Sequence, residues 1–120
     1  MRPLEKSIAS ALSGLKRVWK EERNFKIEST IGALVVLIAI VLRLSRIDMI
    51  VVLLVVSMVL MLEMLNTLLE RFVDIAKPRL HNYVEIIKDT MAAVVLTASI
   101  ASVIIGILIF YPYITEILLS

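Results

Sequence analysis

IVVLLVVSMVLMLEMLNTLLERFVD, residues 50–74, joins a long apolar run to a polar end. Its first thirteen residues carry no charge, whereas the twelve that follow place Glu63, Asn66, Glu70 and Asp74 at intervals of three, four and four. At about 100° per helical residue, these four positions fall within an arc about 80° wide. The stretch therefore predicts a helix that leaves a hydrocarbon layer with three carboxylates and an amide on one face.

The composition assigns the chain to the membrane proteins. Of its 120 residues, 60% are hydrophobic, and the mean hydropathy is +0.96. A soluble domain is usually about 45–50% apolar, and this length allows one domain, residues 1–120. The absence of cysteine excludes a disulfide framework and a thiolate metal site. Three scattered glycines exclude the phosphate-binding loops of Walker A, Rossmann and protein-kinase type.

Three apolar segments are expected to cross a membrane, at residues 27–44, 47–69 and 91–111. The third, MAAVVLTASIASVIIGILIFY, carries no charge and is as long as a spanning helix, which needs roughly 17–25 residues. The first two reach that length if the charged side chains at their ends extend to the interface. The connector before the third segment, DIAKPRLHNYVEIIKD, is predicted to break at Pro78.

Residues 5–24 are predicted to form an amphipathic surface helix. Apolar residues recur at the spacing of one helix face, and lysine, arginine and serine occupy the other face. The apolar set is Ile8, Ala11, Leu12, Leu15, Val18 and Trp19. A basic face with a tryptophan near its end is typical of a helix in the headgroup layer, and packing on a partner protein is the alternative.

The distribution of lysine and arginine predicts the orientation. Seven precede the first span, two lie in the first link, four lie in the second link and none follows Tyr111. The positive-inside rule then makes the amino terminus and second link cytoplasmic and the carboxyl terminus extracytoplasmic. We therefore expect an all-α protein of the inner-membrane type, with a surface helix, three transmembrane helices and its polar residues on the cytoplasmic side.

The polar residues of three segments converge on the cytoplasmic side. Glu63 follows thirteen uncharged residues, and an ionisable group within a membrane costs about 2.5–3.5 kcal/mol, so a functional role is the default hypothesis. Its alternative is a helix end whose carboxylates face water. KEERNFKIE, residues 20–28, adds three carboxylates, and Lys88-Asp89 precedes the third span. Asp89 is also predicted at a helix amino terminus, where it could act as a cap. Such oxygen ligands and a lysine suit Mg²⁺ and phosphate.

The signature Glu63-x-x-Asn66-Thr67-x-x-Glu70-x-x-Val73-Asp74, with Lys88-Asp89 fourteen residues later, resembles that of the bacterial membrane lipid kinases. This family comprises the small diacylglycerol kinases and the undecaprenol kinases. The resemblance extends over nearly the whole chain, including Trp19, Glu22 and Phe25. It implies an enzyme that transfers phosphate from ATP, with Mg²⁺, to the primary hydroxyl of a membrane lipid. It also implies a homotrimer with sites composed between subunits.

The resemblance further implies individual roles. Glu63 would be the general base or orient the lipid hydroxyl, and Asn66 would help to fix the catalytic site and the nucleotide. Glu22 and Glu70 would hold Mg²⁺ against the ATP phosphates, and Lys88 would contact phosphate oxygens. The nucleoside side of the pocket would be formed by Asp74, His81 and Asp89, with Glu28 as a further contributor to the site. Positioning and charge neutralisation are what phosphoryl transfer chiefly needs.

Several positions depart from the family pattern. Bulky residues stand inside the signature where small ones are usual, and the residues before His81 differ from the acidic-Tyr pair of relatives. These departures are Leu68, Leu69, Arg71, Phe72, Arg79 and Leu80. They leave open a non-catalytic membrane scaffold derived from the kinases.

Among the substrates of the family, the resemblance favours undecaprenol as the expected one. ERNFKIE, residues 22–28, resembles the undecaprenol kinases of Gram-positive bacteria, and His81 and KSIASALSG, residues 6–14, favour the same branch. Glu28 is less typical of that branch, so diacylglycerol, which would make the enzyme one of phospholipid biosynthesis, is the alternative. A proton-coupled transporter is a further class, but it would need Glu63 near the bilayer midplane and usually a fourth span.

Overall fold

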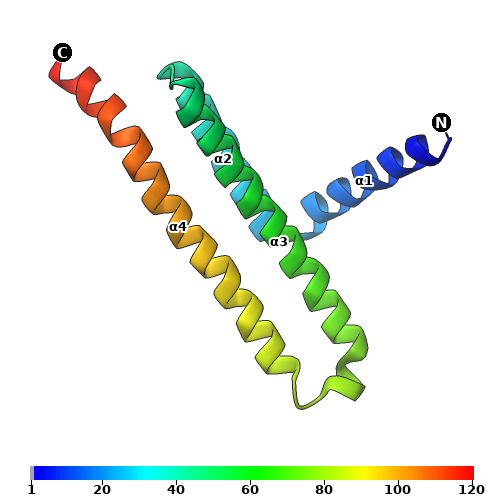
Figure 1. Cartoon of the computed structure of the whole chain (residues 1–120). Coiled ribbons are helices and arrows are strands. Elements are labelled where there is room, and N and C mark those ends of the chain that lie inside the picture. The colour runs from blue at the N-terminus through cyan, green and yellow to red at the C-terminus, as the bar shows by residue number, and fades with distance from the viewer. Residues whose placement is uncertain (1) are drawn as a thin grey trace.

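The computed structural model describes residues 2–120, and these form four helices (Figure 1). In chain order they are α1 (Arg2–Glu21), α2 (Arg23–Val41), α3 (Arg46–Leu80) and α4 (Val84–Leu119). The side chains of Arg2 and Leu80 lie outside the described residues, and with them the departure at Leu80. Helices α2, α3 and α4 are long and apolar enough to cross a membrane. The predicted all-α fold with three spanning helices is therefore confirmed.

Helix α1 projects away from the other three helices and leaves its apolar face uncovered (Figure 1). Leu4, Ile8, Leu12 and Leu15 on this face are each 45% to 61% exposed. The helix ends at Glu21 because Glu22 adopts an extended backbone, with φ −108° and ψ 108°, and α2 begins at the next residue. An exposed apolar stripe on a basic helix is suited to the headgroup layer of a membrane.

Helices α2 and α3 form a closely packed hairpin. Their link is short, contains Arg43 with a φ of 56°, and ends at Ser45, whose hydroxyl accepts a hydrogen bond from the Asp48 amide at 3.2 Å. The two helices touch at Gly32, where an added Cβ would come within 2.8 Å of Val56 Cγ1. Glycine thus lets the α2 backbone approach α3 without the separation that a side chain would impose.

Helix α4 runs alongside α3 but contributes no residue to a buried core. Among the side chains that the structure describes, the buried apolar ones are Phe25, Ala39, Val52 and Val73. Most other large apolar residues are exposed, as expected where lipid rather than water surrounds the helices. The backbone polar groups of these spans are satisfied inside each helix, which the hydrocarbon layer requires.

Two local predictions are wrong. Helix α3 continues through Pro78 to Leu80, so the connector does not break at the proline. A proline removes a hydrogen bond to the carbonyl four residues earlier and crowds it, but here only two helical residues follow, which confines the disturbance to the last turn. Helix α4 begins at Val84, so Asp89 is its sixth residue and does not cap the amino terminus; Glu85 is the acid of its first turn.

Candidate active site

Glu63 lies on α3 with 7% of its surface exposed, which makes it the one buried carboxylate among the described residues. It is 17 residues from the start of α3, or about 26 Å along the helix axis. The hydrocarbon layer of a bilayer is about 30 Å thick, so Glu63 lies near one boundary of that layer if α3 starts at the other. Directly beside it, Thr67 is equally buried, and its hydroxyl donates to the Glu63 carbonyl oxygen at 3.1 Å.

Three further carboxylates surround Glu63 closely enough to repel its charge: Glu28 of α2, Glu70 of α3 and Glu22 between α1 and α2. Two of them, Glu22 and Glu70, are the predicted magnesium ligands. Within residues 2–120, no three histidine or acidic side chains are arranged to hold a metal ion by themselves. A metal at Glu22 and Glu70 would thus need ligands from elsewhere, and Mg²⁺ ordinarily takes one or two carboxylates and completes its shell with phosphates and water. The donor set fits that ion.

Arg71 connects α3 to the junction between α1 and α2. Its guanidinium donates to the Glu21 carboxylate and lies 3.5 Å from the Glu22 carboxylate. All three side chains are about one-third to one-half exposed. The residue that departs from the family pattern beside Glu70 therefore contacts the segment that carries the other candidate metal ligand.

Lys88 on α4 forms an ion pair with Asp74 on α3, with Nζ 2.9 Å from Oδ1. Lys88 precedes the uncharged stretch of α4, at the end of this helix that lies next to the turn from α3. The ion pair thereby holds the predicted phosphate-binding lysine beside Asp74, on the polar end of α3.

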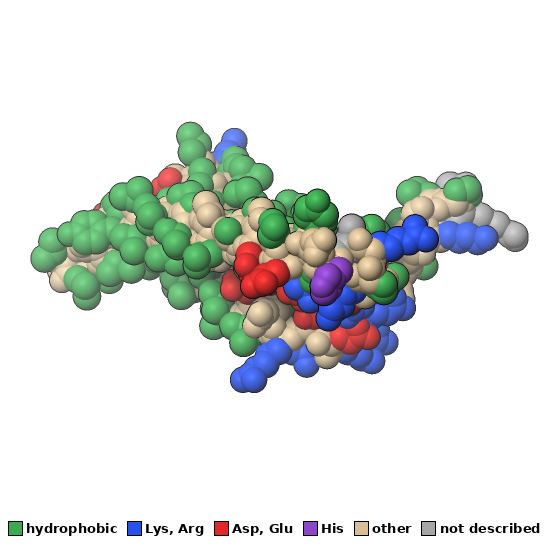
Figure 2. Space-filling view, turned by 90° about the horizontal axis from the view of Figure 1, so that it is seen from below, with side chains coloured by type: hydrophobic (Ala, Val, Ile, Leu, Met, Phe, Trp, Pro, Cys, Tyr) green, Lys and Arg blue, Asp and Glu red, His purple; other side chains and the backbone are tan. Residues whose placement is uncertain are grey.

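The remaining predicted residues are less closely connected. Asn66 is half-buried on the face of α3 that carries Glu63. His81 is exposed in the turn between α3 and α4, and Asp89 is exposed in the second turn of α4. Among the described residues, none of these three side chains makes a hydrogen bond or ion pair. Figure 2 shows the histidine among lysine, arginine and acidic side chains, with the apolar surface extending away from them.

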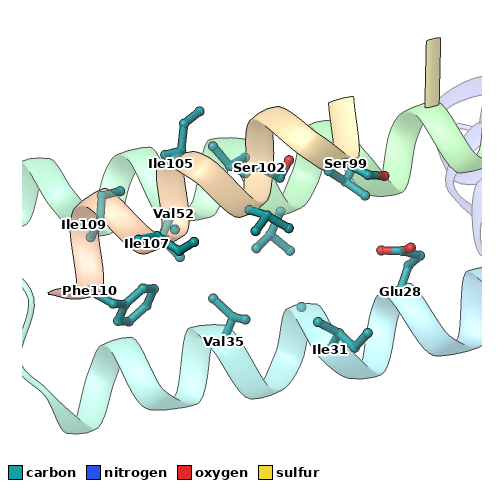
Figure 3. Close-up of a pocket in the computed structure, with 16 residues that line it drawn as sticks. Glu28, Ile31, Val35, Val52, Ser99, Ser102, Ile105, Ile107, Ile109 and Phe110 are labelled. Carbon is teal, nitrogen blue, oxygen red and sulfur yellow. The ribbon is translucent and has the colours of Figure 1, made fainter. Parts of the chain in front are cut away.

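A groove of about 490 Å³ opens between α2, α3 and α4 (Figure 3). Its walls are mostly valine and isoleucine, and its lining includes Val35, Val52, Ile105 and Phe110. The two ends differ: Figure 3 shows Glu28 and Ser99 at one end and Phe110 at the other. Glu28 also acts on the charge of Glu63, so the polar end of the groove adjoins the carboxylate cluster.

Glu21, which is not among the predicted site residues, contacts the site through Arg71. Nothing in the spacing pairs it with Arg71, because the two residues are fifty positions apart and on helices whose relative placement depends on packing. The only available signal was the three carboxylates of residues 20–28, of which Glu21 is one.

Known proteins provide an independent comparison. The family model described as prokaryotic diacylglycerol kinase matches residues 9–110. An undecaprenol kinase of Bacillus subtilis (strain 168) is 32% identical over 107 residues, which cover 89% of this chain and 87% of the relative. A diacylglycerol kinase of Synechocystis sp. is 34% identical over 107 residues, covering 88% of this chain and 61% of that relative. The predicted resemblance is thus confirmed: the chain belongs to the prokaryotic diacylglycerol kinase family of membrane lipid kinases, phosphotransferases that act on a lipid alcohol with ATP as the phosphoryl donor.

Proposed function

We propose that Glu63 is the general base that accepts the proton of the lipid hydroxyl. The position of this buried carboxylate, about 26 Å along α3, is the observation that carries the proposal. A lipid alcohol keeps its chain in hydrocarbon and its hydroxyl at the boundary, which is the level proposed for Glu63. A base must come within about 2.6–3.2 Å of the hydroxyl oxygen, and a residue fixed on a rigid helix can meet that requirement.

Glu22 and Glu70 are the proposed ligands of Mg²⁺. Like charges gathered around Glu63 repel one another, and a divalent cation held by two of them removes that repulsion. When bound, the cation would neutralise charge on the ATP phosphates during transfer. Lys88 is the proposed contact of phosphate oxygens, and it would leave Asp74 to make that contact.

Asn66 is the proposed link between the two halves of the site. It lies one helical turn from both Glu63 and Glu70 on the same face, and its amide both donates and accepts hydrogen bonds. Asp74, His81 and Asp89 are proposed to face the nucleoside. His81 lies in the turn between α3 and α4, Asp74 and Asp89 lie on the two helices that this turn joins, and the exposure of all three leaves them accessible to a soluble nucleotide.

The groove between α2, α3 and α4 is the proposed site of the lipid chain, because its walls are apolar and its polar end adjoins Glu63. We propose undecaprenol as the preferred alcohol and diacylglycerol as the alternative. Residues 22–28, which resemble the undecaprenol kinases, and His81 support this preference.

The protein is proposed to lie in the bacterial cytoplasmic membrane, with the site on the cytoplasmic side and the carboxyl terminus outside. The excess of lysine and arginine before α2 and between α3 and α4 supports this orientation. A homotrimer is proposed as well. The exposed apolar face of α4 and the small number of metal ligands within one chain are compatible with sites completed by a neighbouring subunit.

Transfer of labelled phosphate from ATP tests the proposed function. Purified protein in lipid micelles with Mg²⁺ receives undecaprenol or diacylglycerol in separate reactions, and Glu63→Gln is run beside the wild type. Glu116→Gln, at an exposed carboxylate near the other end of the bundle, is the matched control. We expect transfer to undecaprenol that is lost in Glu63→Gln and kept in Glu116→Gln. If folded protein transfers phosphate to neither lipid, the scaffold alternative replaces the kinase.

A further inference from the structure

The ion pairs of Arg71 occupy a distinctive place in the fold. Among the described residues, they are the only salt bridges that join α3 to the α1–α2 junction. At that junction the helix is interrupted, because Glu22 is extended and no side chain caps α2 at this residue. An interrupted helix can change direction at its break, so a contact that holds the junction also determines where Glu22 lies.

The two carboxylates at Arg71 are not equivalent. Glu21 accepts the close hydrogen bond, whereas Glu22 lies at 3.5 Å, the outer limit for such a bond. Glu21 belongs to the last turn of α1, and Glu22 follows it directly. Glu21 is thus bound by the guanidinium. Glu22 keeps a carboxylate that is oriented toward α3 and can still accept most of its hydrogen bonds or bind a metal.

We infer that Arg71 is a positioning residue for the metal site, with Glu21 as its anchor. By holding Glu21, Arg71 fixes the α1–α2 junction so that Glu22 faces Glu70, the residue next to Arg71 on α3. This inference rests on the proposed roles of Glu22 and Glu70 as Mg²⁺ ligands. It also explains why a bulky, charged residue is tolerated beside Glu70: Arg71 points to the junction.

The expected size of the effect follows from exposure. Arg71 is 46% and Glu21 50% exposed, and an ion pair in contact with water has a small coupling because solvent screens it. Removal of either partner should raise the Mg²⁺ concentration for half-maximal activity about two- to fivefold, with kcat at saturating Mg²⁺ nearly unchanged. A residue that served only general stability would not act on the Mg²⁺ requirement in this selective way.

A double-mutant cycle tests whether the two residues act through one another. Arg71→Gln, Glu21→Gln and the double variant should show the same increase in Mg²⁺ requirement, because each removes the same contact. Arg71→Lys should recover part of the loss, and Arg17→Gln, at an exposed basic residue of α1, is the matched control for charge. If the fold-increases in Mg²⁺ requirement of the two single variants multiplied in the double variant, the inference would be overturned. A lower Mg²⁺ requirement in Arg71→Gln would overturn it as well. The second result would mean that the guanidinium competes with the metal.

A distance measurement supplies a readout independent of activity. The chain contains no cysteine, so spin labels on cysteines introduced at Ser10 of α1 and Lys77 of α3 report on the full protein without background. Double electron–electron resonance between the two labels should give a narrow distance distribution. The distribution should broaden in Arg71→Gln and in Glu21→Gln but stay narrow in Arg17→Gln. An unchanged distribution in Arg71→Gln would refute the positioning role. If the distance distribution broadens in the variants as expected but the wild type transfers no phosphate, the proposed function is refuted, whereas the role of Arg71 in holding the α1–α2 junction is not.

Discussion

The Tyr113 hydroxyl of α4 donates a hydrogen bond to Asp48 Oδ2 at 2.7 Å and accepts one from the Ser45 amide at 2.9 Å. Tyr113 thereby joins the last part of α4 to the first turn of α3, at the end of the bundle opposite the α3–α4 turn. Asp48 also lies at the amino terminus of α3, where the helix dipole favours its negative charge. The contact holds α4 against the α2–α3 hairpin, although α4 contributes no buried residue to the core.

Tyr113→Phe is expected to weaken this attachment. The loss of a hydrogen bond to a charged group should lower the free energy of unfolding by about 1.5–3 kcal/mol, while the distant site keeps its kcat. Tyr111→Phe, which removes an exposed hydroxyl from the same helix, is the control and should have no effect. Thermal denaturation followed by circular dichroism in detergent measures both. Equal midpoints for the two variants would show that the contact does not stabilise the protein.

Gly32→Ala is expected to destabilise the α2–α3 hairpin. The added Cβ would come within 2.8 Å of Val56 Cγ1, and valine has little rotational freedom with which to withdraw. Overpacking of this kind typically costs about 1–3 kcal/mol. Gly106→Ala is the control, since no atom lies within 4 Å of the Cβ it would add. The double variant Gly32→Ala/Val56→Ala should recover stability, and its failure to do so would exclude the clash as the cause.

Lys88→Met is expected to weaken the binding of ATP about tenfold, the effect of losing one charge-assisted hydrogen bond to phosphate. Lys77→Met removes an exposed lysine from the neighbouring helix and serves as the control. Binding of a non-hydrolysable ATP analogue, measured by calorimetry, separates affinity from turnover. Equal affinities for the wild type and Lys88→Met would remove this lysine from the phosphate site.

Glu70→Gln is expected to raise the Mg²⁺ requirement by about tenfold or more, because it removes a direct ligand and not only a residue that supports one. This effect should exceed that of Arg71→Gln, which acts through the position of Glu22. Glu85→Gln, at the exposed acid in the first turn of α4, is the control. The measurement is activity against Mg²⁺ at fixed ATP. An unchanged titration curve in Glu70→Gln would contradict its role as a ligand.

Ser102→Phe is expected to fill the groove between α2, α3 and α4. The serine lines this space from α4, and its hydroxyl bonds to the Ala98 carbonyl of its own helix. The larger side chain should raise the KM for a long-chain alcohol more than that for a short-chain one, with little change in the affinity for ATP. Ser57→Phe on an exposed face of α3 is the control. An equal rise in KM for both chain lengths would argue against the groove as the lipid-chain site.

The spanning helices could be predicted from the sequence because hydrocarbon imposes a requirement that composition alone can report. A helix in lipid must be about 20 residues long and almost free of charge, and residues 91–111 meet this condition wherever the other helices lie. The carboxylate face of residues 63–74 could be predicted for a related reason. Those residues belong to one helix, and the angle between positions on one helix depends only on their spacing.

Helix ends were less predictable. Pro78 and Asp89 both led to wrong local predictions, since a proline near the end of a helix disturbs little and a carboxylate caps only the first turn. Where α3 stops and where α4 starts depends on a few polar residues around the turn, and Pro78 acts too close to the end of α3 to decide it. The hydrophobic pattern that defines the spans does not extend to these polar ends.

The sequence by itself determined an all-helical membrane protein with a polar face where one span meets the interface, since these properties follow from hydropathy and helical periodicity. Only the tertiary structure decided which side chains of different helices meet: Arg71 with Glu21, Lys88 with Asp74, and Tyr113 with Asp48. The physical reason is that such contacts depend on how close two helices approach and how far each is rotated. In the α2–α3 hairpin this was set by the fit of Gly32 against Val56, which no spacing within one helix can report.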